Sequence, residues 1–166
     1  MIDLWGYNDC MIDPAQEKRK LTGVQSGVAG EYYVAAELSA RGYTASITLR
    51  NTRGIDIVCS NADASKSVAI QVKTRRQKAR TWMLDQKVED YYADNLFYVF
   101  VTLNDLKQPP DYFIVPSIVV AKYVKTTHQE WLDTPGRGGI KHNDTSVRKF
   151  RDADEQYMGR WDLLGL

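Results

Sequence analysis

The segment GIDIVCSNADASKSVAIQVK, residues 54–73, contains two strand-like stretches separated by a turn. Residues 54–59 are apolar and partly β-branched around the single acid Asp56, and residues 67–73 alternate apolar and polar side chains. Residues 61–65 are of the small and polar types that form turns. With a strand-like stretch at residues 43–49, the pattern predicts a meander of three antiparallel strands.

The alternation sorts the polar residues of this hairpin onto one face. Side chains along a strand point to opposite faces in turn, so Gln71 and Lys73 lie side by side, about 7 Å apart, away from the apolar set. Asp56 stands between the apolar residues Ile55 and Ile57, so it also points away from the core. If the two strands pair through the turn, Asp56 shares a face with Gln71 and Lys73.

A carboxylate, an amide oxygen and an ammonium group on one face have a coherent chemical use. The two oxygen donors suit a hard cation such as Mg²⁺, and a lysine beside them can orient a water or stabilise developing phosphate charge. A second carboxylate can come from the predicted helix at residues 24–41, which contains Glu31 and Glu37. Small residues near Glu31 favour it for a close contact with the sheet, but the sequence fixes the helix rotation only loosely.

The rest of the chain predicts a single α/β domain. After the meander we expect a helix at residues 85–94, a fully buried strand at 96–103, a strand at 111–115, a helix from Pro116 to about residue 129, a loop at 136–144 and a helical segment at 150–166. Residues 1–22 are expected to form an N-terminal arm, and residues 23–166 the domain, with a central mixed sheet flanked by helices. The apolar residues Trp161, Leu163 and Leu164 are expected to cap its core.

The string GIDIV (54–58) followed by IQVK (70–73) resembles the core motif of the PD-(D/E)XK nuclease superfamily. The stretch GEYYVAAEL (30–38) resembles the first helix of that fold, and the similarity covers roughly residues 24–103. The resemblance implies a restriction-endonuclease-like domain with the core order αβββαβ. It implies hydrolysis of DNA phosphodiester bonds with Mg²⁺, or Mn²⁺ as a substitute. The metal ligands would be Glu31, Asp56 and Gln71, and these with Lys73 would form the catalytic set.

Two positions depart from the common pattern of the superfamily. Ile55 precedes the acid where proline is common, and Gln71 replaces the usual Asp or Glu. Glutamine at this place is similar to Mrr-type enzymes. Because Gln71 is neutral, it should weaken the hold on a second cation, so we expect one tightly held metal ion.

A basic segment, KTRRQKAR at residues 73–80, carries five positive charges and no acid. The net charge of the whole chain is only +1, so this segment is the main local signal for a phosphate backbone. The alternative is a solvated charged loop. Trp82, which follows it, could wedge against bases, although a packing role is favoured. The predicted DNA-contacting residues are Arg53, Thr74, Arg75, Arg76, Lys78 and Arg80.

Other functional classes lack support in the sequence. No apolar run approaches the roughly 20 residues that a membrane-spanning helix needs. Residues 1–10 contain no basic residue, which argues against a secretion signal and favours a cytoplasmic location. Cys10 and Cys59 lack zinc-site spacing, and His128 and His142 lack further ligands.

Two hypotheses therefore remain for the function. The first is a Mg²⁺-dependent DNA endonuclease, for which a double-strand break would require a homodimer or two binding events. The second is a catalytically inactive module of the same fold that binds DNA or a protein partner. The small size of the chain leaves little room for a sequence-reading domain, so a partner protein could supply specificity. An unrelated α/β enzyme acting on a small molecule has no supporting motif.

Overall fold

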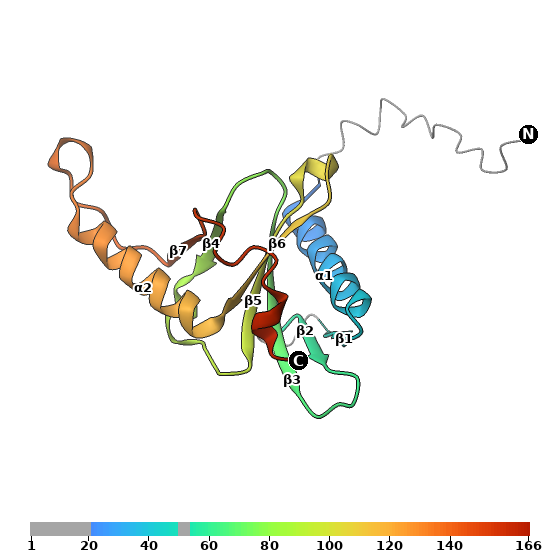
Figure 1. Cartoon of the computed structure of the whole chain (residues 1–166). Helices are drawn as coiled ribbons and strands as arrows, with labels where there is room; N and C mark the ends of the chain where they lie inside the picture. The colour runs from blue at the N-terminus through green and yellow to red at the C-terminus, as the bar shows by residue number, and fades with distance from the viewer. Residues whose placement is uncertain (1–20, 50–53) are drawn as a thin grey trace, which may run out of the picture.

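The computed structural model describes residues 21–49 and 54–166, and the structural statements below concern these residues. They form a five-stranded mixed sheet with the strand order β1-β2-β3-β5-β6 and a separate two-stranded sheet of β4 and β7. Helices α1 and α2 lie on opposite sides of the large sheet (Figure 1). The expected α/β architecture, a mixed sheet flanked by helices, is confirmed.

The three-stranded meander is also confirmed. Strands β1 (Thr44–Ile47), β2 (Ile57–Ser60) and β3 (Ser67–Arg75) pair antiparallel in sequence order. The turn between β2 and β3 is held by its own polar side chains: Asn61 Oδ1 accepts a hydrogen bond from the Lys66 amide at 2.9 Å. These local hydrogen bonds help fix the register that places the site residues.

Strand β5 (Leu96–Thr102) lies parallel to β3, and all seven of its residues are buried. Strand β6 (Asp111–Pro116) follows antiparallel to β5 at the edge of the sheet. A strand covered on both faces needs apolar side chains in both directions, which explains the unbroken apolar run of β5.

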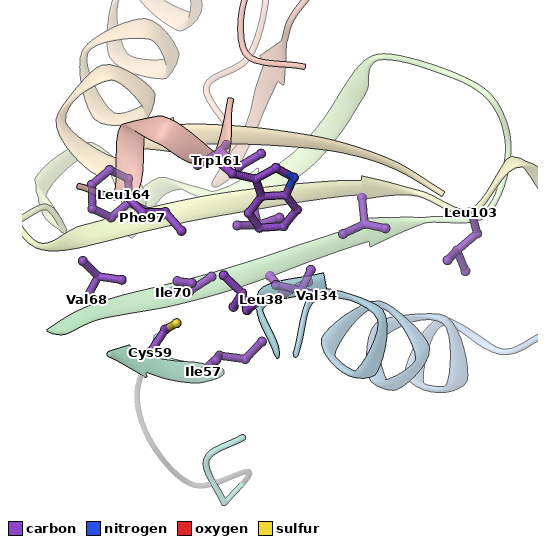
Figure 2. Close-up of a cluster of buried hydrophobic side chains, with 14 residues drawn as sticks. Val34, Leu38, Ile57, Cys59, Val68, Ile70, Phe97, Leu103, Trp161 and Leu164 are labelled. Carbon is purple, nitrogen blue, oxygen red and sulfur yellow. The ribbon is translucent and has the colours of Figure 1, made fainter. Parts of the chain in front are cut away.

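Helix α1 (Gly23–Ala40) covers one face of the large sheet. It begins with a capping box, in which the Thr22 side chain accepts from the Gln25 amide and the Gln25 side chain accepts from the Thr22 amide. Figure 2 shows Val34 and Leu38 of α1 in the buried cluster with side chains of the sheet. Trp161 and Leu164 join this cluster and Leu163 packs against it, so the expected capping of the core is confirmed.

The other face is covered by α2 (Ser117–Asp133) and by the sheet of β4 (Thr81–Asp85) and β7 (Val147–Arg151). Trp82 of β4 is buried, with its ring centroid 4.9 Å from that of Phe100 and 5.0 Å from that of Phe113. The packing role favoured for Trp82 is therefore confirmed. No helix in the described ranges is both long and apolar enough to cross a membrane.

The helix predicted at residues 85–94 is wrong. Strand β4 ends at Asp85, and a five-residue 3-10 helix, Gln86–Asp90, follows it. Trp82 and Leu84 are buried while their neighbours are not, which is the period of a strand. Only Val88 anchors the 3-10 helix in the core, so there is no second apolar position to sustain an α-helix. The expected core order therefore lacks its second helix, whose place is taken by β4 and this short turn.

The helical segment predicted at residues 150–166 is also wrong. Its first residues belong to β7, which pairs antiparallel with β4, and only Trp161–Leu164 form a 3-10 helix. In β7 the buried residues Arg148 and Phe150 alternate with exposed ones. The pairing partner lies far away in the sequence, so the local pattern at the end of the chain could not reveal it.

Candidate active site

Asp56 stands immediately before β2, and hydrogen bonds fix its main chain and its side chain. Its amide donates to the Ile70 carbonyl at 2.9 Å, and its carbonyl accepts from the Thr48 amide at 2.9 Å. The Asp56 Oδ2 atom accepts from the Val72 amide at 2.7 Å. Continuing the β2–β3 register by one residue puts Asp56 opposite Gln71. The carboxylate is therefore tied to the part of β3 that carries the other predicted site residues.

Gln71 and Lys73 lie on the face of β3 that points away from α1. Val68, Ile70 and Val72 are all in the α1-facing core, so the alternate residues take the other face. The parallel pairing with β5 puts Gln71 beside Tyr98, and Lys73 beside Phe100. Gln71 is buried and Lys73 is half-buried. The structure thus brings Asp56, Gln71 and Lys73 together in adjoining strands.

The electrostatics of Lys73 connect both predicted carboxylates. Burial lowers the pKa of Lys73 below its ordinary value. The negative charges of Asp56 and Glu31 raise the pKa, and the positive charge of Lys87 lowers it further. Both carboxylates are therefore close enough to influence the Lys73 ammonium. A lysine with a lowered pKa gives up its proton more readily than an exposed one.

Glu31, not Glu37, is the α1 acid that faces Asp56. Glu31 and Asp56 both line a pocket of about 280 Å³ between α1 and the segments before β2. Glu37 instead forms an ion pair with Arg41 one turn further along α1. Gln71 and Lys73 do not line this pocket, so Asp56 is the residue that links it to β3.

A close approach of α1 to β3 brings Glu31 near the sheet. A Cβ atom at Gly30 would lie only 1.8 Å from Thr74 Oγ1, so the contact requires glycine. Thr74 therefore faces α1, with a buried hydroxyl oxygen that has no hydrogen-bond partner among the described residues. Thr74, which we predict from the sequence to contact DNA, lies in this helix–sheet contact.

Tyr98, in the buried strand β5, is a neighbour of the site, because it pairs with Gln71. Its hydroxyl is buried and, within the described part of the chain, has no hydrogen-bond partner. Burial raises the pKa of Tyr98, and the nearby Tyr91 and Asp56 raise it further. A buried hydroxyl without a partner usually has a water or a ligand nearby. The sequence offers no signal that Tyr98 lies beside the site, because an aromatic residue in an apolar strand is typical of a core.

The oxygen donors fit a hard divalent cation. Two carboxylates, from Glu31 and Asp56, and the Gln71 amide oxygen match the ligand types of Mg²⁺, which keeps several waters and needs few protein ligands. Among the residues that the structure describes, no three His, Cys, Asp or Glu side chains group together as a metal site.

The basic segment is less free than its sequence indicates. Arg75 donates to the Thr81 carbonyl. Arg76 Nε lies 3.1 Å from Asp105 Oδ1. Arg80 forms an ion pair with Glu155 and also donates to the Ala153 carbonyl at 3.2 Å.

The last two predicted DNA-contacting residues are Lys78 and Arg53. Lys78 is exposed and is in no ion pair within the described ranges. Arg53 lies outside the described residues. Asp105, Ala153 and Glu155 come from segments distant in sequence, so residues 73–80 alone could not reveal these partners.

Comparisons with known proteins give matches only at the level of structure. No protein-family model matches the sequence, and no curated protein matches it. The structure is similar to Hjc, a Holliday junction resolvase from the archaeal hyperthermophile Archaeoglobus fulgidus, at 15% identity over 76% of this chain and 84% of that one, with a TM-score of 0.42. It is also similar to the bacterial homing endonuclease I-Ssp6803I, at 15% identity over 88% of this chain and 94% of that one, with a TM-score of 0.52. At this identity the likeness is one of fold alone, and it agrees with the restriction-endonuclease-like α/β fold expected from the sequence.

Proposed function

We propose that this protein is a metal-dependent endonuclease that hydrolyses DNA phosphodiester bonds. The observation that carries the proposal is the position of Asp56, whose carboxylate is bound to the Val72 amide between Gln71 and Lys73 and shares a pocket with Glu31. The nuclease fold supports the same conclusion.

Glu31, Asp56 and Gln71 would hold one Mg²⁺ ion, or Mn²⁺ in its place. When bound, such a cation lowers the pKa of a water and neutralises charge on a phosphate oxygen. The hydrogen bond from Val72 keeps one Asp56 oxygen occupied and leaves the other for the cation. The neutral Gln71 adds an oxygen without a second full charge, which favours a single ion.

Lys73 would orient the attacking water and stabilise charge on the phosphate. Its lowered pKa increases the fraction of neutral amine that could accept a proton, while Asp56 and Glu31 favour its charged form.

Phosphate contacts outside the metal site would come from the basic segment. Lys78 is exposed and can reach a phosphate directly. Arg75, Arg76 and Arg80 would have to exchange their present protein partners for phosphate oxygens. Thr74 would contribute indirectly, by its contact with Gly30 of α1. Arg53 would extend the cationic surface upstream.

The test is nicking of supercoiled plasmid with Mg²⁺ or Mn²⁺, with and without chelator. We expect metal-dependent nicking by the purified wild-type protein and a loss on the order of 10²-fold or more in Asp56→Asn and Lys73→Ala. Glu37→Gln is the matched control, since it changes an α1 acid away from the pocket. Cleavage that persists in both site variants refutes the assignment. Calorimetry that detects no divalent binding would instead favour an inactive module of the same fold.

A further inference from the structure

A second concave surface, here called the outer groove, lies between α2 and the sheet of β4 and β7. Its volume is about 580 Å³, and it shares no residue with the pocket of Glu31 and Asp56. In Figure 1, α2 and the β4–β7 sheet lie on the side of the molecule away from α1. Its lining includes Thr81, Lys149 and Arg151 of the two strands and the aromatic residues Tyr123 and Trp131 of α2.

The strand pairing aligns the cations of the groove. Trp82, Leu84, Arg148 and Phe150 are the buried residues of β4 and β7, so the alternate side chains face outward. The register sets Thr81 opposite Arg151, and Met83 opposite Lys149. Lys149 and Arg151 are two residues apart on the same strand face and therefore form a row.

The charge of the groove is one-sided. Lys149 and Arg151 line it, and no Asp or Glu of residues 21–49 and 54–166 does. In the described part of the chain neither cation takes part in an ion pair. The buried neighbour Arg148, by contrast, is paired with Glu89. Two exposed cations that form no ion pair with the described residues attract an anionic partner.

Acids also stand at the rim of the groove. Asp144 is hydrogen-bonded at 2.8 Å to His128, which lines the groove, and Asp85 ends β4 opposite the lining residue Val147. Lys149 and Arg151 lie toward the other end of the β4–β7 pairing, opposite Met83 and Thr81. Thr81 and Thr145 add hydroxyl groups to the polar lining. Cations with hydroxyl donors are the usual contacts of a phosphate backbone.

The groove also continues the basic segment that starts at the candidate active site. Residues 73–80 run from Lys73 to Arg80, and the next residue, Thr81, begins β4 and is part of the groove lining. The Asp152 amide donates to the Arg80 carbonyl at 3.2 Å, which ties the end of β7 to this segment. A polyanion that leaves the site along this segment therefore meets Arg151 and then Lys149.

We infer that the outer groove binds the phosphate backbone of the DNA duplex on one side of the cleaved bond. The inference rests on the proposed function for its choice of polyanion. It gives the small protein a means to hold DNA beyond the metal site without a separate DNA-binding domain.

The test measures binding of a fluorescein-labelled DNA duplex of mixed sequence by anisotropy, in chelator and over a range of salt concentrations. Lys149→Ala/Arg151→Ala should weaken binding on the order of tenfold and reduce the slope of log Kobs against log salt by about 2, roughly one for each lost phosphate contact. Lys149→Arg should retain the wild-type slope. Lys66→Ala removes one exposed cation in the turn before β3. It is the charge-matched control for the single variant Lys149→Ala, and we expect it to weaken duplex binding less than Lys149→Ala does.

The outcomes separate this inference from the proposed function. A folded double variant with wild-type affinity and slope overturns the groove assignment, even if plasmid nicking is intact. A wild-type protein that binds duplex through Lys149 and Arg151 but never nicks plasmid supports the groove and refutes the nuclease proposal alone. Absence of any duplex binding by the wild-type protein overturns the inference as well.

Discussion

The Val72 amide donates a hydrogen bond to Asp56 Oδ2 at 2.7 Å, so a side chain extends the β2–β3 pairing beyond the first residue of β2. Because β2 begins only at Ile57, the Asp56 carboxylate takes the place of a main-chain acceptor. The Asp56 carboxylate thus has a structural role, as the acceptor for the Val72 amide, and a proposed role as a metal ligand. Substitution can separate these two roles.

Asp56→Ala should lower both stability and cleavage, and Asp56→Asn should lower mainly cleavage. Alanine leaves the amide of the buried residue Val72 without an acceptor, which costs about 1–3 kcal/mol of unfolding free energy, whereas the asparagine amide oxygen can still accept. Urea unfolding of both variants, alongside plasmid nicking, checks this. Equal stability of Asp56→Ala and the wild-type protein would show that the hydrogen bond contributes nothing.

Gly30→Ala should destabilise the protein by about 1–3 kcal/mol, because its Cβ would overlap Thr74 Oγ1 and force α1 away from β3. Glu31 moves with the helix, so divalent binding should weaken as well. Gly27→Ala, on the same helix, has no atom within 4 Å of its new Cβ, and it should stabilise by about 0.5–1 kcal/mol. Thermal unfolding of both variants tests this prediction. Similar changes in melting temperature for Gly30→Ala and Gly27→Ala would contradict the close contact between α1 and β3.

The sequence allowed the geometry around Asp56, Gln71 and Lys73 to be predicted because period-two alternation is a local property of a strand. Strand β5 could also be predicted, because a strand buried on both faces appears in the sequence as an unbroken apolar run. The sheet of β4 and β7 was missed because pairing between Thr81–Asp85 and Val147–Arg151 depends on contacts across more than sixty residues of chain. The same holds for Glu155 and Asp105, whose ion pairs with the basic segment no local pattern could indicate.

Tyr98→Phe should leave the metal-free protein as stable as the wild type or slightly more stable. Its hydroxyl is buried without a partner in the described structure, so the substitution removes a group that costs free energy to bury. If that hydroxyl binds a water or ligand of the metal site, Mn²⁺ affinity measured by calorimetry should fall by about 10-fold or more. Unchanged affinity in a folded variant would restrict Tyr98 to packing.

The turn between β2 and β3 predicts a dependence of stability on pH. Asp63 Oδ1 accepts from Ser65 Oγ at 2.7 Å and from the Ser65 amide at 3.1 Å, and these hydrogen bonds hold the Asp63 pKa below its usual value. A folded pKa below the unfolded value of about 3.9 means that the stabilisation is complete above that value and is lost as the pH falls through the folded pKa.

The difference in melting temperature between the wild type and Asp63→Ala should therefore be constant near neutral pH and should shrink below about pH 4. Ser65→Ala keeps the carboxylate but removes its hydroxyl donor, so this variant should show a weaker loss of stability on acidification than the wild type. Melting curves from neutral to acidic pH test both expectations. A difference that stays the same across the acid range would mean that the Ser65 hydrogen bonds do not favour the charged form of Asp63, and that the register of the β2–β3 hairpin depends on its core contacts instead.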